Sequence, residues 1–147
     1  MTRHIVVGLD GSGESHKALA VAKDMAQCMG KEDCKIVLIT VVEWSPYKFQ
    51  TPQENALRHQ RKKEEVDGAF TQILNPALDD LKADGFQAEA FCKHGDAAEL
   101  INDMAEDLNA NHILIGRTGR RDLKRRLFGG VAHKLAIEAT IPVTIVP

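Results

Sequence analysis

Short apolar runs alternate with helical patterns along the whole chain, and this alternation constrains the fold more than any other feature. Four of the runs are nearly continuous, so we expect strands at Ile5–Leu9, Ile36–Val42, Ile113–Ile115 and Val143–Val146. A fifth run, Phe86–Cys92, alternates between apolar and polar residues, as an edge strand with one wetter face does. Strands that alternate with helices form parallel sheets. The sequence therefore predicts an α/β domain with a five-stranded parallel sheet and helices on both faces.

The segments between the strands carry recognisable helix signals. We expect Ser12 to cap a helix that ends at Gly30, and Asp96 to cap the helix that follows the third strand. The helix before that strand contains Pro76, and it should kink or divide just before this residue. A last helical pattern begins at Val131. Each helix then forms a right-handed crossover between parallel strands.

Length and composition limit the class of protein. A chain of 147 residues is expected to form one domain spanning residues 1–147, with 44% hydrophobic and 27% charged residues, a common globular composition. No apolar run approaches the roughly 18 residues of a membrane helix, and no signal-peptide pattern opens the chain. The three cysteines lack C-x-x-C spacing and the six histidines are scattered, so disulfides and a metal site are not expected. We expect a cytoplasmic protein without a membrane partner.

The last third of the chain holds the strongest candidate for a ligand site. The run Ile113–Ile115 leads into Gly116 and Gly119, and Gly129 and Gly130 precede the helical pattern. Glycines let the backbone approach a bulky anion, and a helix start offers free N–H groups at the positive end of its dipole. In the alternative interpretation, the glycines merely end a strand and open a helix. Spacing alone does not decide between the two.

A basic loop lies between these glycines. The loop contains a single acidic residue, Asp122, and six basic ones: Arg117, Arg120, Arg121, Lys124, Arg125 and Arg126. On a chain with a net charge of −2, such a loop favours an anionic partner, although a charge run can also be a solvated loop. No aromatic residues interleave the arginines to stack on bases, so a nucleic acid is an unlikely partner.

The spacing Gly116-x2-Gly119-x9-Gly129 resembles the nucleotide-binding signature of the universal stress protein (UspA-like) family. The usual signature continues with Ser or Thr, where this chain has Gly130. The opening Ile5–Ser12, Gly95 and the closing Ile141–Val146 also fall where that family has them, so the resemblance covers essentially the whole chain. It implies a Rossmann-like fold of the adenine nucleotide alpha hydrolase-like type, with strand order 3-2-1-4-5.

The resemblance also implies a set of nucleotide-binding residues, drawn from the ends of three strands and the start of the last helix. They are Gly8, Leu9, Asp10, Gly11, Ser12, Val41, Gly116, Arg117, Gly119, Gly129, Gly130 and Val131. Among them, Asp10 would hydrogen-bond the nucleoside and Val41 would contact the adenine. Gly116 and Gly119 would admit the ribose and phosphates, and the N–H groups from Gly129 to Val131 would hold phosphate oxygens. Gly8 stands where many nucleotide-binding members have proline.

The function implied by the resemblance is a sensor that binds ATP with Mg²⁺ and acts through a protein partner. No general base or water-positioning residue is evident near the glycines, so we expect little or no hydrolysis. The family commonly dimerises through its last strand, which implies a homodimer joined through Val143–Val146. The contrasting hypothesis is a nucleotide-free dimeric interaction module of the same fold. A third, an adenylating enzyme, rests on a faint similarity of Asp10–Ser15 to the loop of ATP pyrophosphatases.

Overall fold

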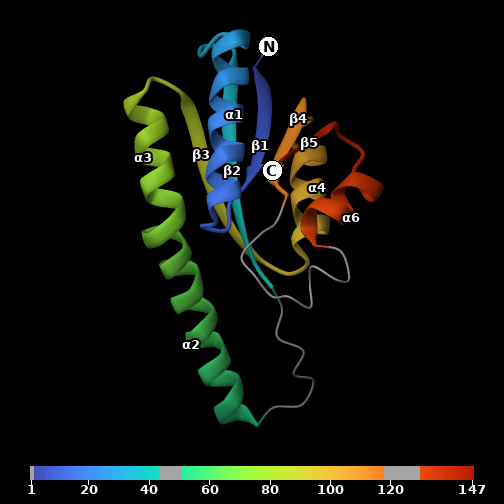
Figure 1. Cartoon of the computed structure of the whole chain (residues 1–147). Helices are drawn as coiled ribbons and strands as arrows, with labels where there is room; N and C mark the ends of the chain where they lie inside the picture. The colour runs from blue at the N-terminus through green and yellow to red at the C-terminus, as the bar shows by residue number, and fades with distance from the viewer. Residues whose placement is uncertain (1, 44–50, 118–129) are drawn as a thin grey trace.

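The computed structural model describes residues 2–43, 51–117 and 130–147. Five parallel strands form one sheet in the order β3-β2-β1-β4-β5, which confirms the predicted fold class and strand order (Figure 1). The strands are β1 Arg3–Gly8, β2 Cys34–Val42, β3 Gln87–His94, β4 His112–Gly116 and β5 Val143–Val146. The helices are α1 Gly13–Met29, α2 Pro52–Ala69, α3 Asn75–Ala83, α4 Ala97–Asp107 and α6 Val131–Glu138.

Two apolar clusters hold the helices against the two faces of the sheet. The cluster on one face joins the strands to α1 and α3, through residues such as Val7, Ala18 and Leu81. The cluster on the other face joins the same strands to α4 and α6, through residues such as Ile101 and Leu135. Because side chains alternate along a strand, β1 and β4 supply apolar residues to both clusters. This double burial explains why the central strands read as continuous apolar runs.

The segment around Pro76 is divided just before the proline, as predicted, but by a wider turn rather than by a break. A π-helical turn, Phe70–Leu74, connects α2 to α3, and the N–H of Asn75 reaches back to the carbonyl of Phe70. Proline has no N–H and its ring crowds the preceding turn of an α-helix. A π-helical turn adjusts the hydrogen-bonding register at that point, and the helix continues past the proline. Figure 1 shows α2 and α3 as one long rod, with α2 extending beyond the carboxyl ends of the strands.

β3 lies at one edge of the sheet, as its alternating pattern predicted, but it is shifted and longer than expected. It begins at Gln87 instead of Phe86 and continues to His94, two residues past the predicted end. Its pairing with β2 extends as far as Val42 and His94. The ladder of backbone hydrogen bonds is indifferent to side-chain hydropathy, so a long partner strand extends β3 beyond its apolar pattern.

β5 forms the opposite edge of the sheet and, within the described residues, pairs only with β4. The ring of His112, at the start of β4, lies within hydrogen-bond distance of the Thr144 hydroxyl on β5. Burial lowers the pKa of His112 below its usual value, which favours the neutral ring in this contact.

In the part of the chain that the structure describes, no helix has the length and apolar character needed to cross a membrane.

Candidate functional site

The carboxyl ends of β1 and β4 are neighbours at the point where the chain changes faces. β1 and β4 pair in parallel, from Ile5 opposite His112 to Val7 opposite Leu114. The chain leaves β1 into α1 on one face of the sheet, whereas α6, the next described helix after β4, packs on the other face. In open parallel sheets, ligands bind in the crevice beyond the strand ends at such a switch point. Asp10 after β1 and Gly116 at the end of β4 therefore lie on neighbouring strands at this switch point.

The turn from β1 to α1 is closed by its own hydrogen bonds. The Asp10 carboxylate accepts a hydrogen bond from the Ser12 N–H at 2.9 Å, and Gly11 has a φ of 83°, which favours glycine. Ser12 is the N-cap of α1, as predicted, and its hydroxyl oxygen accepts from the Ser15 N–H at 3.1 Å. This side-chain cap already satisfies an N–H donor in the first turn of α1. The start of α1 is therefore capped by a side chain of its own segment.

The start of α6 differs in this respect. Its N-cap, Gly130, is extended, with φ −75° and ψ −172°, and makes no side-chain capping hydrogen bond. The N–H groups in the first turn of a helix have no partner within the helix, and they lie at the positive end of its dipole. An added Cβ on Gly130 would meet no atom within 4 Å. Of the two helix starts, that of α6 is the one suited to hold an anion.

The predicted site residues at the ends of β1 and β2 divide between the two faces of the sheet. Leu9 is 2% exposed and belongs to the core beneath α1, so only its backbone is available to a ligand. An added Cβ on Gly8 would lie 3.2 Å from Ile101, on the face that carries α4 and α6. Val41 and Val131 pack against the apolar cluster of that same face. The structure therefore places Gly8, Val41 and Val131 on one face of the sheet, and the Leu9 side chain on the other.

Gly116 has a packing role that the prediction of a ligand contact did not anticipate. A Cβ at this position would lie 2.8 Å from the backbone carbonyl carbon of Glu14 and 2.9 Å from the Ser15 nitrogen. Gly116 therefore lets the first turn of α1 approach the end of β4. This close approach is a reason for glycine at this position that does not involve a ligand. The exposed Arg117 follows, and its N–H donates to the Val146 carbonyl at 2.7 Å. Gly119 and Gly129 lie outside the described residues.

Sequence reasoning missed two residues beneath the Asp10 turn. Ser15 and Thr40 are 3% and 5% exposed, and both are hydrogen-bonded to the segment from Leu9 to Ser12. The signal for Thr40 was present, because it is a hydroxyl residue inside the otherwise apolar run Ile36–Val42. A buried hydroxyl needs a hydrogen-bond partner, and a strand rich in apolar residues does not supply one by itself.

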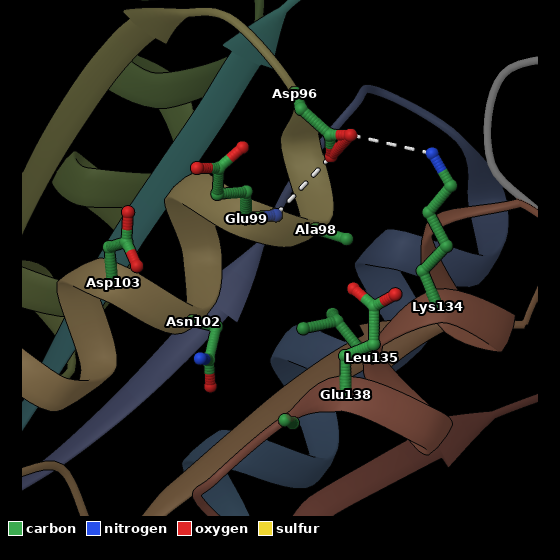
Figure 2. Close-up of a pocket in the computed structure, with 9 residues that line it drawn as sticks. Asp96, Ala98, Glu99, Asn102, Asp103, Lys134, Leu135 and Glu138 are labelled. Atoms are coloured by element: carbon green, nitrogen blue, oxygen red, sulfur yellow. Dashed lines mark hydrogen bonds and ion pairs between the residues drawn. The ribbon is translucent and has the colours of Figure 1, made fainter.

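A hollow of about 200 Å³ lies elsewhere, between α4 and α6 (Figure 2). Its lining combines four carboxylates with one lysine, one asparagine and three apolar residues: Asp96, Ala98, Glu99, Asn102, Asp103, Lys134, Leu135, Glu138 and Ala139. The Lys134 ammonium lies 3.4 Å from an Asp96 oxygen, while the other Asp96 oxygen caps α4, as predicted, at the Glu99 N–H. Its acidic rim repels an anion. We therefore place the candidate anion site in the crevice rather than here.

Comparisons with known proteins agree on one family. The model of the universal stress protein family matches residues 1–147. The chain is 27% identical over 165 residues to the stress response protein NhaX of Bacillus subtilis, covering 97% of this chain and 96% of that protein. It is 30% identical over 146 residues to the universal stress protein MJ0531 of Methanocaldococcus jannaschii, covering 98% of this chain and 81% of that protein.

Solved structures share the fold. UspA from Lactobacillus plantarum superposes with a TM-score of 0.80 at 18% identity, over 99% of this chain and 97% of that one. A family protein from Arabidopsis thaliana with AMP bound gives 0.66 at 18% identity, over 98% and 90% of the two chains. The universal stress protein from Archaeoglobus fulgidus in complex with dAMP gives 0.60 at 17% identity, over 100% and 98%.

Proposed function

The chain belongs to the universal stress protein family, and on that premise we propose that it binds ATP with Mg²⁺ in the crevice beyond β1 and β4. In this proposal it serves in a stress response as a cytoplasmic sensor that acts through a protein partner and hydrolyses little or no ATP. The observation that carries the proposal is the start of α6, a helix N-terminus without a side-chain cap, together with the Asp10 turn that follows β1. Relatives of the same fold that hold AMP and dAMP support an adenine nucleotide as the ligand.

The residues of the crevice fit such a ligand. In the proposal, the first N–H groups of α6 hold phosphate oxygens, and the glycine at the N-cap leaves room for them. The Asp10 carboxylate, oriented by the Ser12 N–H, accepts a hydrogen bond from a ribose hydroxyl. Val41 contacts the adenine from the face that α6 covers. Mg²⁺ binds mainly through phosphate oxygens and water, so it needs few protein ligands.

We propose negligible turnover because the site offers positioning groups without an evident general base. One oxygen of the Asp10 carboxylate accepts the Ser12 N–H at 2.9 Å, which suits it to orient a ligand. Positioned phosphates without a group to activate water give binding with little catalysis.

We expect purified protein to retain an adenine nucleotide that is released on denaturation. Single-turnover hydrolysis should be far slower than the roughly 1 per second of an ordinary enzyme. Hydrolysis at that rate, lost in Asp10→Ala, would show that the protein is an enzyme.

A second candidate function is a nucleotide-free interaction module of the same fold. Two observations favour it: Gly130 stands where the family signature has Ser or Thr, and among the described residues no strand pairs with the outer edge of β5. Protein that releases no nucleotide on denaturation, and that gives no heat on titration with ATP and Mg²⁺, would establish this function in place of the first.

In both cases we propose a homodimer joined through β5. An uncovered strand edge presents unpaired N–H and carbonyl groups that a second copy can satisfy, and Ile145 on this strand is 38% exposed. Sedimentation at micromolar concentration should show a dimer. Ile145→Lys should dissociate it, because a lysine on an edge strand disfavours pairing. The matched control is Leu57→Lys on α2, where leucine is 56% exposed, and this variant should remain a dimer. A monomer with β5 intact would contradict the proposal.

A further inference from the structure

Among the described residues, the buried polar side chains are Ser15 and Thr40, and both serve the same peptide unit. The Thr40 hydroxyl donates to the Leu9 carbonyl at 2.8 Å. The Asp10 N–H, which belongs to the same peptide unit as that carbonyl, points to the Ser15 hydroxyl at 3.5 Å. The Ser15 hydroxyl in turn donates to the Ser12 carbonyl at 2.9 Å. The peptide between Leu9 and Asp10 is thus held at both its carbonyl and its N–H.

The place of this peptide in the sheet explains why it needs side-chain partners. The Leu9 N–H still donates to the Ile39 carbonyl at 2.9 Å, which continues the pairing of β1 with β2 by one residue. At the Leu9 carbonyl, the Thr40 side chain supplies the hydrogen bond. Buried backbone groups that lose their ladder partner are costly unless another donor replaces it. The Thr40 hydroxyl is that donor. Its hydrogen bond to the Leu9 carbonyl is shorter than the contact between the Asp10 N–H and the Ser15 hydroxyl.

The orientation of the Leu9–Asp10 peptide determines the direction in which the Asp10 side chain points. Rotation of the Leu9–Asp10 peptide would change ψ of Leu9 and φ of Asp10, and so redirect the carboxylate. Leu9 on one side is fixed in the core, whereas Gly11 on the other has the torsional freedom to absorb a rotation. Buried hydrogen bonds at both ends of the peptide oppose that rotation.

We propose that Thr40 and Ser15 are positioning residues for the ligand site, which clamp the Leu9–Asp10 peptide so that Asp10 faces the crevice. The expected effect on ligand affinity rests on the proposed nucleotide binding, whereas the clamp itself is a property of the ligand-free protein. A preorganised carboxylate binds more tightly because no ordering is required when the ligand arrives.

The test compares two substitutions at Thr40. Thr40→Val removes the hydroxyl with little change in shape, and Thr40→Ser keeps the hydroxyl. ATP affinity is measured with Mg²⁺ by titration calorimetry, at a temperature at which each variant is folded. We expect Thr40→Val to weaken binding about tenfold, because the net contribution of a hydrogen bond is close to the roughly 1.4 kcal/mol of a tenfold change. Thr40→Ser should restore the affinity. Equal affinity in Thr40→Val and the parent would overturn the proposal.

A control separates positioning from general loss of stability. Ile36 is fully buried in the same strand, so Ile36→Val should lower the melting temperature through lost core contacts. It should leave ATP affinity unchanged, because Ile36 lies opposite Ile5, four residues before Leu9 in the sequence. If Ile36→Val weakens ATP binding as much as Thr40→Val does, the hydroxyl acts only through stability and the proposal fails.

A second measurement needs no nucleotide. Amide hydrogen exchange of Asp10 in the ligand-free protein should be faster in Ser15→Ala and in Thr40→Val than in Ile36→Val, by about fivefold to tenfold for a lost hydrogen bond. If the parent protein binds no ATP, the proposed function fails, while this exchange result still decides the clamp. Unchanged exchange of Asp10 in both hydroxyl-deleted variants would overturn the clamp even if ATP binds.

Discussion

Replacing Gly116 by alanine should destabilise the protein by about 2–3 kcal/mol, near the upper end for an overpacked core. The added Cβ would lie 2.8 Å from the Glu14 backbone carbon and 2.9 Å from the Ser15 nitrogen. These are backbone atoms in the first turn of a helix, so no flexible side chain can move aside to relieve the overlap. Either α1 shifts away from β4 or the end of β4 bends. Chemical denaturation monitored by circular dichroism measures the loss.

The matched control is Gly68→Ala, in the last turn of α2. A Cβ at this position meets no atom within 4 Å. Alanine is favoured over glycine in a helix interior by about 1 kcal/mol, so this variant should be more stable than the parent. Two glycine-to-alanine changes are thus expected to have opposite signs. If Gly116→Ala is as stable as the parent, α1 does not approach β4 as closely as the structure shows.

Replacing Gly130 by serine should tighten ATP binding by about tenfold to a hundredfold, because a hydrogen bond to a charged group contributes about 1.5–3 kcal/mol. The extended conformation of Gly130 accepts any residue, and the space around its Cβ position is open. A serine oxygen at this N-cap can accept the His133 N–H while its own hydrogen points to a phosphate. Compared with glycine, serine at the N-cap adds only a few tenths of a kcal/mol to the stability of the protein.

Gly130→Ala provides the control for this prediction. It adds the same Cβ without the hydroxyl, so it should bind ATP no better than the parent. Calorimetric titration of the three proteins, with thermal melts to confirm folding, measures the difference. A folded Gly130→Ser variant that binds ATP no more tightly than Gly130→Ala would show that the signature does not bring a phosphate to this residue.

The fold was largely predictable because it depends on local patterns in the sequence. The continuous apolar runs identified strands buried on both faces, and Ser12 and Asp96 are the N-caps that their positions before helical patterns predicted. The order of the strands came from the resemblance to a family. The end of β3 and the π-helical turn before Pro76 were not predictable, because the first depends on the length of β2 and the second on how a helix accommodates proline.

The site was less predictable, because the type of a residue does not reveal which group in the fold it contacts. A glycine after a strand permits close approach, and only the structure shows that the group approaching Gly116 is the backbone of α1. Leu9 precedes Asp10 in the same motif, yet its side chain is directed into the core. Thr40 was passed over as one residue of an apolar strand, although its hydroxyl holds the turn that carries Asp10.

The most direct test of the central claim is to titrate ATP with Mg²⁺ into ¹⁵N-labelled protein and follow the backbone amides. Phosphates held at the start of α6 should shift the amides of Val131, Ala132 and His133, together with those of Gly11 and Ser12 next to Asp10. The amides of Glu99 and Asp103, in the acidic hollow between α4 and α6, should move little. Shifts confined to that hollow, or no shifts with millimolar ATP, would contradict the proposed nucleotide site.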